Sequence, residues 1–299
     1  MAQRAGKSRV KPQKLTKGKG KRYDGDFSKF KKKEEEPIRT PVQRKNKVME
    51  QAAKNSTIQL SKDGTMRLNK YIAHAGVCSR READKLIETG AITINGKIVT
   101  ELGHKVKRGD KVHLDGQLLR AEQLQYVLLN KPKGFVTTTD DPQARKTVMD
   151  LIKRACNERI YPVGRLDLKT TGLLLFTNDG DLAKKLTHPK HRVRKVYHVY
   201  LDKALTKNDM LKIAEGIELE DGIIDVDKIS YVEDIKSKQE IGIQIHSGKN
   251  RIVRRLFEHL GYEVVKLDRV VFAGLTKKDL PRGKWRHLTP KELDFLKII

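Results

Sequence analysis

The sequence has few of the residues and patterns that mark secreted, membrane-inserted or metal-bound proteins. Its 299 residues include two cysteines, Cys78 and Cys156, too few for a disulfide scaffold or a cysteine zinc cage. No stretch approaches the roughly 18 apolar residues of a membrane-spanning helix. No apolar segment typical of a secretory signal stands at the amino terminus. These absences predict a protein of the reducing cytoplasm with no membrane partner.

The common cofactor motifs are also missing. There is no G-x-G-x-x-G segment, no G-x-x-x-x-G-K-[ST] loop, and no H-E-x-x-H spacing among the nine histidines. The absence of a glycine loop argues against an S-adenosylmethionine-dependent methyltransferase. Two distant cysteines cannot supply the C-x-x-C pair of a zinc deaminase. We therefore expect chemistry by ordinary side chains, with no metal and no small-molecule cofactor.

Positive charge is what the sequence has in excess. It holds 64 lysines and arginines against 38 acidic residues, a net charge of +26. Such a charge repels itself in a compact chain, so a polyanion that neutralises it is the expected partner. A membrane surface is the competing partner, but no amphipathic anchor with exposed Trp, Phe or Leu is present. Nucleic acid is the favoured interpretation.

The first part of the chain, residues 1–63, is predicted to be a disordered basic tail. Residues 1–60 contain 18 basic and 6 acidic side chains and almost nothing that could fill a core. Such a tail would bind RNA backbone without sequence preference. A merely solubilising tail is the alternative. The tail does not account for the whole charge, because residues 61–299 still hold 46 basic and 32 acidic groups.

Residues 64–122 are predicted to form a small helix–helix–hairpin domain. Apolar residues recur at helical spacing between Leu68 and Ala75, and Gly76 ends that helix. Ser79 and Glu82 have the spacing of a capping box that opens a second helix, and Asn95-Gly96 is typical of a hairpin turn. A phosphate-binding face or an ordinary solvated face is equally compatible with its basic side chains, which are Arg67, Lys70, Arg80, Arg81 and Lys85.

This segment resembles the S4 RNA-binding domain. The resemblance is carried by R-L-N-K-Y at residues 67–71, A-G-V-C-S-R-R-E-A at residues 75–83, and G-A-I-T-I-N-G at residues 90–96. It implies binding to structured RNA through the two helices. Cys78 falls at the helix–turn, where packing is its expected role.

Residues 123–299 alternate strand-like and helix-like segments irregularly. More strands than helices, unevenly spaced, favour an α+β fold with a mixed, mainly antiparallel sheet over a doubly wound one. The expected strands are 126–130, 159–163, 173–178, 196–201 and 242–246, and the expected helices are 181–186, 206–215 and 251–260.

One loop of this second domain suggests chemistry. Asp167 lies between Arg165 and Lys169 in the segment that joins two apolar strands. Both cations favour the ionised carboxylate. An acid close to phosphates needs a reason, and catalysis is one. An Asx turn or a cap is the other, since that is the commonest role of a loop aspartate.

The same loop resembles the catalytic loop of the RsuA family of bacterial rRNA pseudouridine synthases. That family has G-R-L-D-x-x-T-x-G-L-L, and this chain has G-R-L-D-L-K-T-T-G-L-L at residues 164–174. Three further segments agree in order: N-K-P-K-G at 130–134, K-V-Y at 195–197, and G-K-N-R-I-V-R-R-L-F at 248–257. With the S4-like unit, the resemblance covers about residues 64–292, and the sequence after the loop is closer to the large-subunit branch.

The resemblance implies that a uridine in ribosomal RNA, 23S rather than 16S, is isomerised to pseudouridine. The uracil is detached from C1′ at N1, turned, and rejoined through C5. Asp167 would be the essential carboxylate, either attacking the nucleotide or removing a sugar proton. Arg254 would pair with Asp167, and Tyr197 would stack on the flipped uracil. Without the resemblance, Tyr197 is a core residue and Arg254 a surface phosphate contact.

Five further basic residues of this domain are candidate RNA contacts, although a solvated side chain is the alternative for the lysines: Lys131, Arg165, Lys195, Arg251 and Arg255. Arg251, Arg254 and Arg255 have the spacing of one broad helix face. We expect a monomer that acts on rRNA alone or within a ribosome assembly intermediate. The alternative to an enzyme is a non-catalytic S4 protein that serves as an assembly factor or RNA chaperone.

Overall fold

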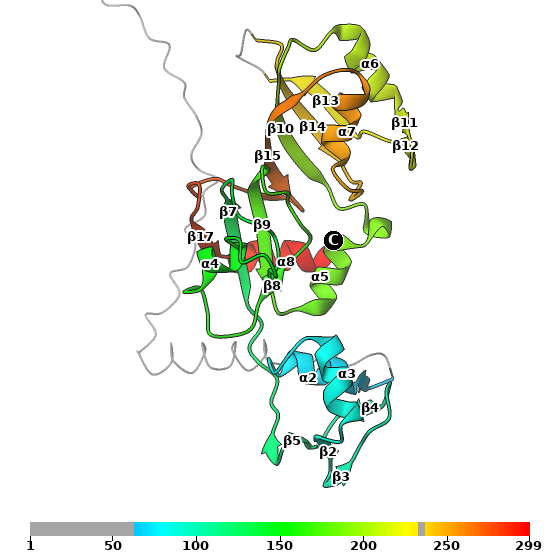
Figure 1. Cartoon of the computed structure of the whole chain (residues 1–299), viewed down its shortest axis with the longest axis vertical. Coiled ribbons are helices and arrows are strands. Elements are labelled where there is room, and N and C mark those ends of the chain that lie inside the picture. The colour runs from blue at the N-terminus through cyan, green and yellow to red at the C-terminus, as the bar shows by residue number, and fades with distance from the viewer. Residues whose placement is uncertain (1–62, 233–236) are drawn as a thin grey trace, which may run out of the picture. The chain divides into compact units, whose positions relative to one another are not determined.

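A computed structural model describes residues 63–232 and 237–299 (Figure 1). The predicted tail lies almost wholly outside these described residues. The first domain contains β1 (Thr65–Arg67), α2 (Leu68–His74), α3 (Arg80–Glu88), β2 (Ile92–Ile94), β3 (Lys97–Ile98), β4 (Lys105–Lys107), β5 (Val112–Leu114) and β6 (Gln117–Leu118).

The two helices of the first domain form as their sequence predicts. Leu68 and Ile72 of α2 are buried, one helical turn apart, against Ala83 and Ile87 of α3. The side chain of Ser79 accepts a hydrogen bond from the backbone of Glu82, whose side chain accepts one from the backbone of Ser79. This confirms the predicted capping box, which satisfies two free N–H groups at the start of α3.

Two tight hairpins complete the first domain. Asn95 and Gly96 both have positive φ, 52° and 81°, as the turn between β2 and β3 requires. Asp115 and Gly116 repeat this geometry between β5 and β6. β1 pairs separately with β4, a contact that the sequence did not reveal.

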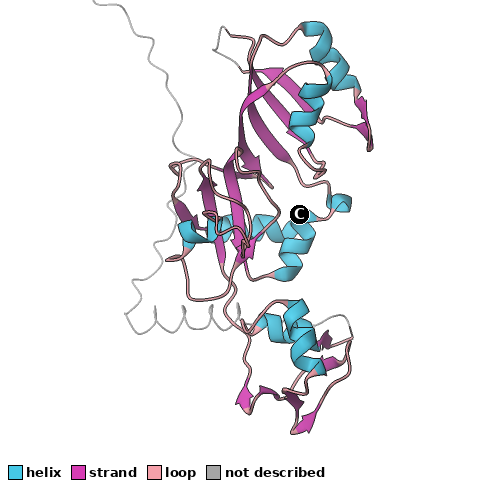
Figure 2. Ribbon diagram, in the orientation of Figure 1, coloured by secondary structure: helices cyan, strands magenta, loops and turns pink. Residues whose placement is uncertain are grey.

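The second domain is built on one nine-stranded sheet (Figure 2). Its elements are β7 (Tyr126–Lys131), α4 (Val148–Ile152), β8 (Tyr161–Pro162), β9 (Thr171–Thr177), α5 (Gly180–Thr187), a 3₁₀ turn (Pro189–His191), β10 (Lys195–Leu201), α6 (Lys207–Glu215), β11 (Ile217–Leu219), β12 (Gly222–Ile224), β13 (Lys228–Tyr231), β14 (Glu240–Ile245), α7 (Ile252–His259), β15 (Val264–Phe272), β16 (Leu275–Thr276), β17 (Trp285–His287) and α8 (Pro290–Ile298).

The sheet has two antiparallel halves joined by one short parallel contact. The strand order is β13-β14-β10-β15-β9-β7-β17, with β16 on β15 and β8 on β9. β15 and β9 pair in parallel over two residue pairs, one of which places Arg269 opposite Gly172. Gly172 has φ +110°, and a Cβ there would lie 2.3 Å from the carbonyl oxygen of Arg269. Glycine is therefore required for the backbones to approach at this join.

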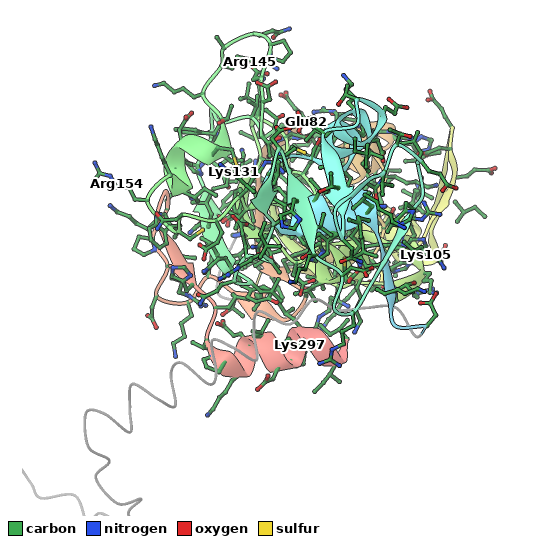
Figure 3. The ribbon with its side chains drawn as sticks, turned by 90° about the horizontal axis from the view of Figure 1, so that it is seen from below. Glu82, Lys105, Lys131, Arg145, Arg154 and Lys297 are labelled. Carbon is green, nitrogen blue, oxygen red and sulfur yellow. The ribbon has the colours of Figure 1, made fainter. Side chains whose placement is uncertain are left out.

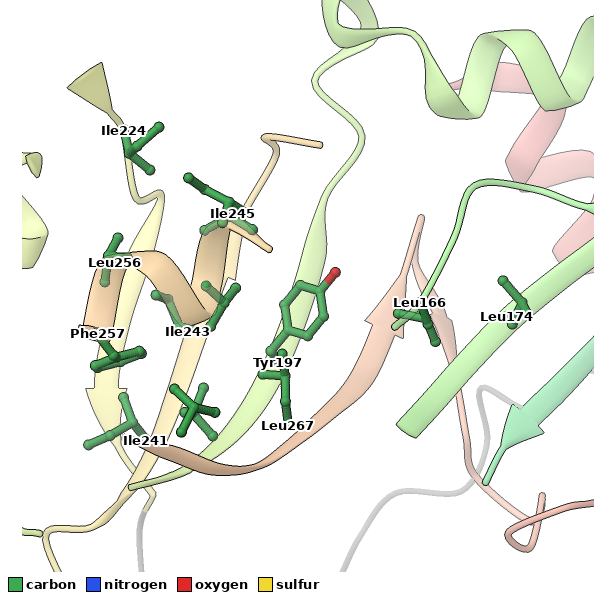
Figure 4. Close-up of a cluster of buried hydrophobic side chains, with 14 of the residues drawn as sticks. Leu166, Leu174, Tyr197, Ile224, Ile241, Ile243, Ile245, Leu256, Phe257 and Leu267 are labelled. Atoms are coloured by element: carbon green, nitrogen blue, oxygen red, sulfur yellow. The ribbon is translucent and has the colours of Figure 1, made fainter. Parts of the chain in front are cut away.

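The half of the sheet that contains β7 and β9 contributes to two hydrophobic cores, one on each face. Alternate residues of β7 enter different cores: Val127 and Leu129 pack in the larger one, and Tyr126 and Leu128 in the other. The larger core also holds α7 and the inward residues of β10 and β14 (Figure 4). The second core includes α5 and α8. β7 is thus buried on both sides, which explains its unbroken run of buried residues.

The α+β class with a mixed, mainly antiparallel sheet is confirmed. The predicted strand at 159–163 is shorter than expected, since β8 covers two residues. The central strand β15 and the helices α4 and α8 were not predicted. Among the described residues, no helix is long and apolar enough to cross a membrane.

Candidate active site

The loop that carries Asp167 runs from the end of β8 to the start of β9. It is fixed by a hydrogen bond within the loop and by packing against the rest of the domain. Its turn is closed by the backbone N–H of Thr170, which donates to the carbonyl oxygen of Asp167 at 3.0 Å. Leu166 is buried in the larger core, so the residue before Asp167 anchors the loop. The carboxylate of Asp167 is therefore presented from a fixed backbone.

The segment after β7 braces the same loop. The hydroxyl of Thr137 donates to the carbonyl oxygen of Leu166 at 2.7 Å and accepts from its N–H at 3.3 Å. The N–H of Gly134 donates to the carbonyl oxygen of Leu168 at 3.0 Å. Both residues that flank Asp167 are thus hydrogen-bonded to one neighbouring segment, which limits movement of the carboxylate.

Lys131 supplies a third brace, and its burial does not favour the expected contact with phosphate. Its side chain is 0% exposed. Figure 3 shows Lys131 well inside the outline of the molecule, whereas Arg154 and Lys297 lie at its edges. Its ammonium donates to the carbonyl oxygens of Asp167, Thr170 and Pro132 at 3.0, 2.9 and 3.2 Å. Burial lowers the pKa of Lys131 to about 8, although the charge of Asp167 opposes the shift. A buried cation can serve loop carbonyls but cannot reach an RNA backbone.

Asp167 opens into a pocket of about 280 Å³ beside β10 and β15. Its side chain is 40% exposed and lies 4.0 Å from the guanidinium of Arg251. Arg251, the residue before α7, has φ +45°, a left-handed backbone that is strained for a residue with a side chain. The pocket is lined by the loop of Asp167, by Tyr197 and by residues 247–253, so three of the four family-like motifs meet there.

Arg254 lies within the electrostatic reach of Asp167 but is not its nearest cation. Its side chain is buried, and its Nη1 donates to the carbonyl oxygen of Val264 at 2.6 Å. Its Nε and Nη2 atoms have no partner among the described residues. Burial and the charge of Arg251 lower the pKa of Arg254, while Asp167 opposes this shift. In this structure the direct ion pair to Asp167 comes from Arg251, and pairing of Arg254 with Asp167 stays a prediction.

The expectation that three arginines share one helix face is wrong. Arg251 precedes α7, Arg254 points into the core, and Arg255 points to the turn between β11 and β12. There its guanidinium forms a two-pronged ion pair with Asp221, with distances of 3.0 and 2.6 Å. The left-handed backbone at Arg251 breaks the helical spacing on which the expectation relied.

Tyr197 belongs to the core and also borders the pocket. It alternates with Val199 and Leu201 on the buried face of β10, as its spacing predicts, and is 9% exposed. In Figure 4 its ring lies between the β14 isoleucines and Leu166, which comes from the loop of Asp167. The core interpretation and the catalytic one are therefore compatible, because packing fixes a ring that still lines the pocket.

Lys195 and Arg165 occupy different positions at this pocket. Lys195 donates to the carbonyl oxygen of His246 at 2.7 Å and is half-buried, and burial lowers its pKa to about 8. Its main contact is thus the segment that leads into residues 247–253, rather than solvent. Arg165 is exposed at the rim. Its role as an RNA contact stays a prediction.

The basic residues of the first domain lie on or beside α2 and α3. Arg67, Arg80, Arg81 and Lys85 are exposed, and Lys70 is half-buried. Arg80 also donates to the side-chain oxygen of Asn69 at 3.2 Å, which joins the starts of the two helices. The exposed members can present the phosphate-binding face that the sequence suggests.

Sequence reasoning missed two residues of this site. Thr137 carries no motif of its own, and only its distance from Leu166 reveals its role. Arg269 lies in the pocket on β15, a strand that was not predicted. Among the described residues, no group of three or more His, Cys, Asp or Glu side chains could hold a metal ion.

Comparisons with known proteins agree with this arrangement. A family model for RNA pseudouridylate synthases matches residues 125–259, and the S4 domain model matches residues 66–112. The chain is 45% identical over 235 residues to ribosomal large subunit pseudouridine synthase B of Bacillus subtilis. The matched region covers 78% of this chain and 96% of that protein.

Two further matches cover similar parts of the chain. The chain is 39% identical over 241 residues to the dual-specificity RNA pseudouridine synthase RluF of Escherichia coli K12, covering 79% of this chain and 80% of that one. A crystal structure of a pseudouridylate synthase matches with 33% identity and a TM-score of 0.56, covering 77% of this chain and 99% of the other. The chain belongs to the RsuA family of RNA pseudouridine synthases, with an S4 domain ahead of the synthase domain.

Proposed function

We propose that this synthase isomerises one uridine of large-subunit (23S) ribosomal RNA to pseudouridine, with Asp167 as its essential carboxylate. The observation that carries the proposal is the position of Asp167, braced at its backbone and open to a pocket that Tyr197 also lines. The names of two relatives support an RNA substrate, and the name of the Bacillus relative supports the large subunit.

The surroundings of Asp167 suit a carboxylate that must remain ionised. The guanidinium of Arg251 is 4.0 Å away, and the charge of the buried Arg254 also acts on Asp167. These positive charges offset part of the cost of burying the carboxylate when RNA covers the pocket and excludes water. An ionised, fixed carboxylate can serve either as nucleophile or as base beside the ribose.

The pocket suits a single flipped nucleoside. Its volume of about 280 Å³ lies just below the roughly 300–1,000 Å³ of sites for drug-sized ligands. Tyr197 offers a rigid ring on which an extruded uracil can stack, which offsets part of the few kcal/mol that base flipping costs. The isomerisation adds and removes no atoms overall, so the proposal requires no group donor and no oxidant, and it assigns the chemistry to side chains alone.

The S4 domain is proposed to supply affinity for folded rRNA. Its exposed cations on α2 and α3 would contact phosphates and thereby place the second domain on its target. We propose that the protein acts as a cytoplasmic monomer.

The test is to map pseudouridines in the 23S and 16S rRNA of a strain that lacks this protein, with and without added wild-type protein. Free rRNA and immature ribosomal particles are supplied in separate reactions. One position restored in 23S rRNA supports the proposal. A restored position in 16S rRNA contradicts the choice of subunit. Tight rRNA binding with no restored position in either reaction contradicts the enzyme and favours an assembly factor.

A further inference from the structure

Arg269 is a buried cation in the pocket of Asp167. It lies on β15 and is 3% exposed. Its Nε donates to the carbonyl oxygen of Leu173 at 2.8 Å, and its guanidinium carbon is 4.4 Å from the ring centre of Phe272. These contacts fix the guanidinium at the join of the two half-sheets, where it lines the pocket together with Asp167 and Tyr197.

The charge of Arg269 has no acidic partner among the residues that the structure describes. Asp268, the neighbour in sequence, is paired with Arg282 and Lys277 and does not serve Arg269. The Nη2 atom of Arg269 is buried without a hydrogen-bond partner. An uncompensated buried charge costs stability, so a native protein that keeps one needs a reason for it.

The polar side chain that faces Arg269 is Tyr197. The register of β10 and β15 places the two residues directly opposite each other, so their side chains lie on one face of the sheet. Burial lowers the pKa of Arg269, and the electrostatic interaction with the neighbouring Tyr197 opposes that shift. The tyrosine is thus the link between the buried cation and the space where a base would stack.

We propose that Arg269 is a positioning residue that orients and polarises the Tyr197 hydroxyl, and thereby stabilises negative charge on the uracil while it is detached from the ribose. The inference rests on the proposed function and deepens it. It assigns the hydroxyl of Tyr197 a role that its packed ring alone does not provide.

The chemistry requires such a charge. When the N1–C1′ bond breaks, its electron pair remains on the uracil, and the negative charge spreads over N1 and the two carbonyl oxygens. When C5 then bonds to C1′, the proton on C5 is lost and N1 gains a proton, so the product is an isomer. A guanidinium N–H that donates to the Tyr197 oxygen strengthens the O–H donated to a uracil oxygen. This interaction is stronger for the detached anion than for the neutral base, so it favours the chemical step over binding.

The test is a double-mutant cycle on rRNA isolated from a strain that lacks this protein. The variants are Arg269→Gln, Tyr197→Phe, their combination, and Arg269→Lys, which keeps the charge. Arg286→Gln is the matched control, because Arg286 pairs with Glu292 away from the pocket. Each variant is checked for folding by thermal unfolding, for rRNA affinity, and for its rate constant of pseudouridine formation in a single turnover.

We expect Arg269→Gln and Tyr197→Phe each to lower the single-turnover rate about 30- to 100-fold, with rRNA affinity changed less than threefold. The double variant should be no more than threefold slower than Tyr197→Phe, since both changes interrupt the same chain. Arg269→Lys should have a single-turnover rate at least tenfold higher than that of Arg269→Gln. If Arg269→Gln does not fold, Arg269→Lys replaces it in the cycle. The inference then requires that Arg269→Lys lowers the single-turnover rate of the otherwise wild-type protein but does not lower that of Tyr197→Phe.

Two results overturn the inference alone while the wild-type protein is active. One is a rate for Arg269→Gln equal to that of Arg286→Gln. The other is a double variant whose loss is the product of the two single losses, since Arg269 would then act independently of Tyr197. A wild-type protein that forms no pseudouridine on this rRNA and on immature ribosomal particles overturns the proposed function, and this inference with it.

Discussion

The ammonium of Lys131 and the backbone carbonyl of Asp167 are joined by a hydrogen bond of 3.0 Å. The lysine is the last residue of β7, and the aspartate lies in the loop that follows β8, so the bond spans 36 residues. Because the same ammonium also serves Thr170, one buried cation fixes both ends of the turn that presents the carboxylate. Lys131 therefore supports the site without touching its substrate.

Replacing Lys131 by Met should weaken both the fold and the reaction. The change keeps the volume of the side chain but leaves three carbonyls without their donor, which costs about 2–4 kcal/mol of unfolding free energy. The rate of pseudouridine formation should fall at least tenfold, as the turn loosens. Denaturant unfolding and single-turnover assays measure the two effects. The exposed neighbour Lys133, replaced by Met, is the control, and equal behaviour of the two variants would contradict the assigned role.

The pH dependence of stability should also report on Lys131. Burial lowers its pKa to about 8, while an unfolded lysine titrates near 10.5. Between these values the unfolded chain binds the extra proton, so the unfolding free energy contributed by this group rises with pH. Below pH 8 its contribution is constant. Denaturant unfolding from pH 7 to 10 should show a more positive slope for wild type than for Lys131→Met. Parallel curves for the two proteins would show that folding does not lower the pKa of Lys131.

Gly172 should tolerate no side chain. A Cβ at this position would meet the backbone of Arg269 at 2.3–2.8 Å, at the contact that joins the two half-sheets. Gly172→Ala should therefore cost more than about 3 kcal/mol or prevent folding, because backbone cannot move aside as a side chain can. Gly283→Ala is the matched control: its φ is +79° but nothing lies within 4 Å, so it should cost only about 1–2 kcal/mol of backbone strain. A Gly172→Ala protein as stable as Gly283→Ala would refute the close approach.

Arg254 and Arg251 should have separable effects. Arg254 is buried with two unpartnered nitrogens, so Arg254→Gln should lower the single-turnover rate about 100-fold. Arg251 is 45% exposed, so Arg251→Gln should mainly weaken rRNA binding and make its salt slope about one unit less steep. Rates at saturating protein and affinities at several salt concentrations distinguish the two. The opposite assignment follows if Arg251→Gln abolishes the rate while leaving affinity intact.

The S4 face should contribute affinity alone. Replacing Arg80, Arg81 and Lys85 together by Ala removes three exposed cations from α3 without touching its buried residues, Ala83 and Ile87. Weaker binding and a salt slope about three units less steep are expected, with the rate at saturating protein unchanged. Binding measured from 50 to 300 mM salt tests this. An unchanged slope would remove these residues from the RNA interface.

Local patterns predicted the fold where the interactions are local. The capping box at Ser79 and the turn at Asn95-Gly96 require only neighbouring residues, and both formed as expected. The central strand β15 depends instead on partners far away in sequence, on β10 and β9. Its buried Asp268 and Arg269 interrupt the apolar pattern of a strand, so periodicity could not reveal it.

The site shows the same division. The loop of Asp167 could be located from its motif, but its supports could not. Lys131 has the sequence appearance of a phosphate contact, and only its complete burial identifies it as a brace. The spacing of Arg251 and Arg254 predicts one helix face, whereas a positive φ at Arg251 separates them. Burial and backbone strain are tertiary properties that a single sequence does not display.

The most direct measurement of the central claim is pseudouridine formation by Asp167→Asn, beside wild type, on rRNA from a strain that lacks this protein. The substitution keeps the size and shape of the side chain, replaces one acceptor oxygen by an NH2 donor, and removes the charge. The account predicts that the variant binds this rRNA with wild-type affinity and that its single-turnover rate falls at least about 1,000-fold, since losing one catalytic group costs about 10⁴–10⁶ in well-studied cases. A variant that binds and restores the modification at more than a tenth of the wild-type rate would contradict it.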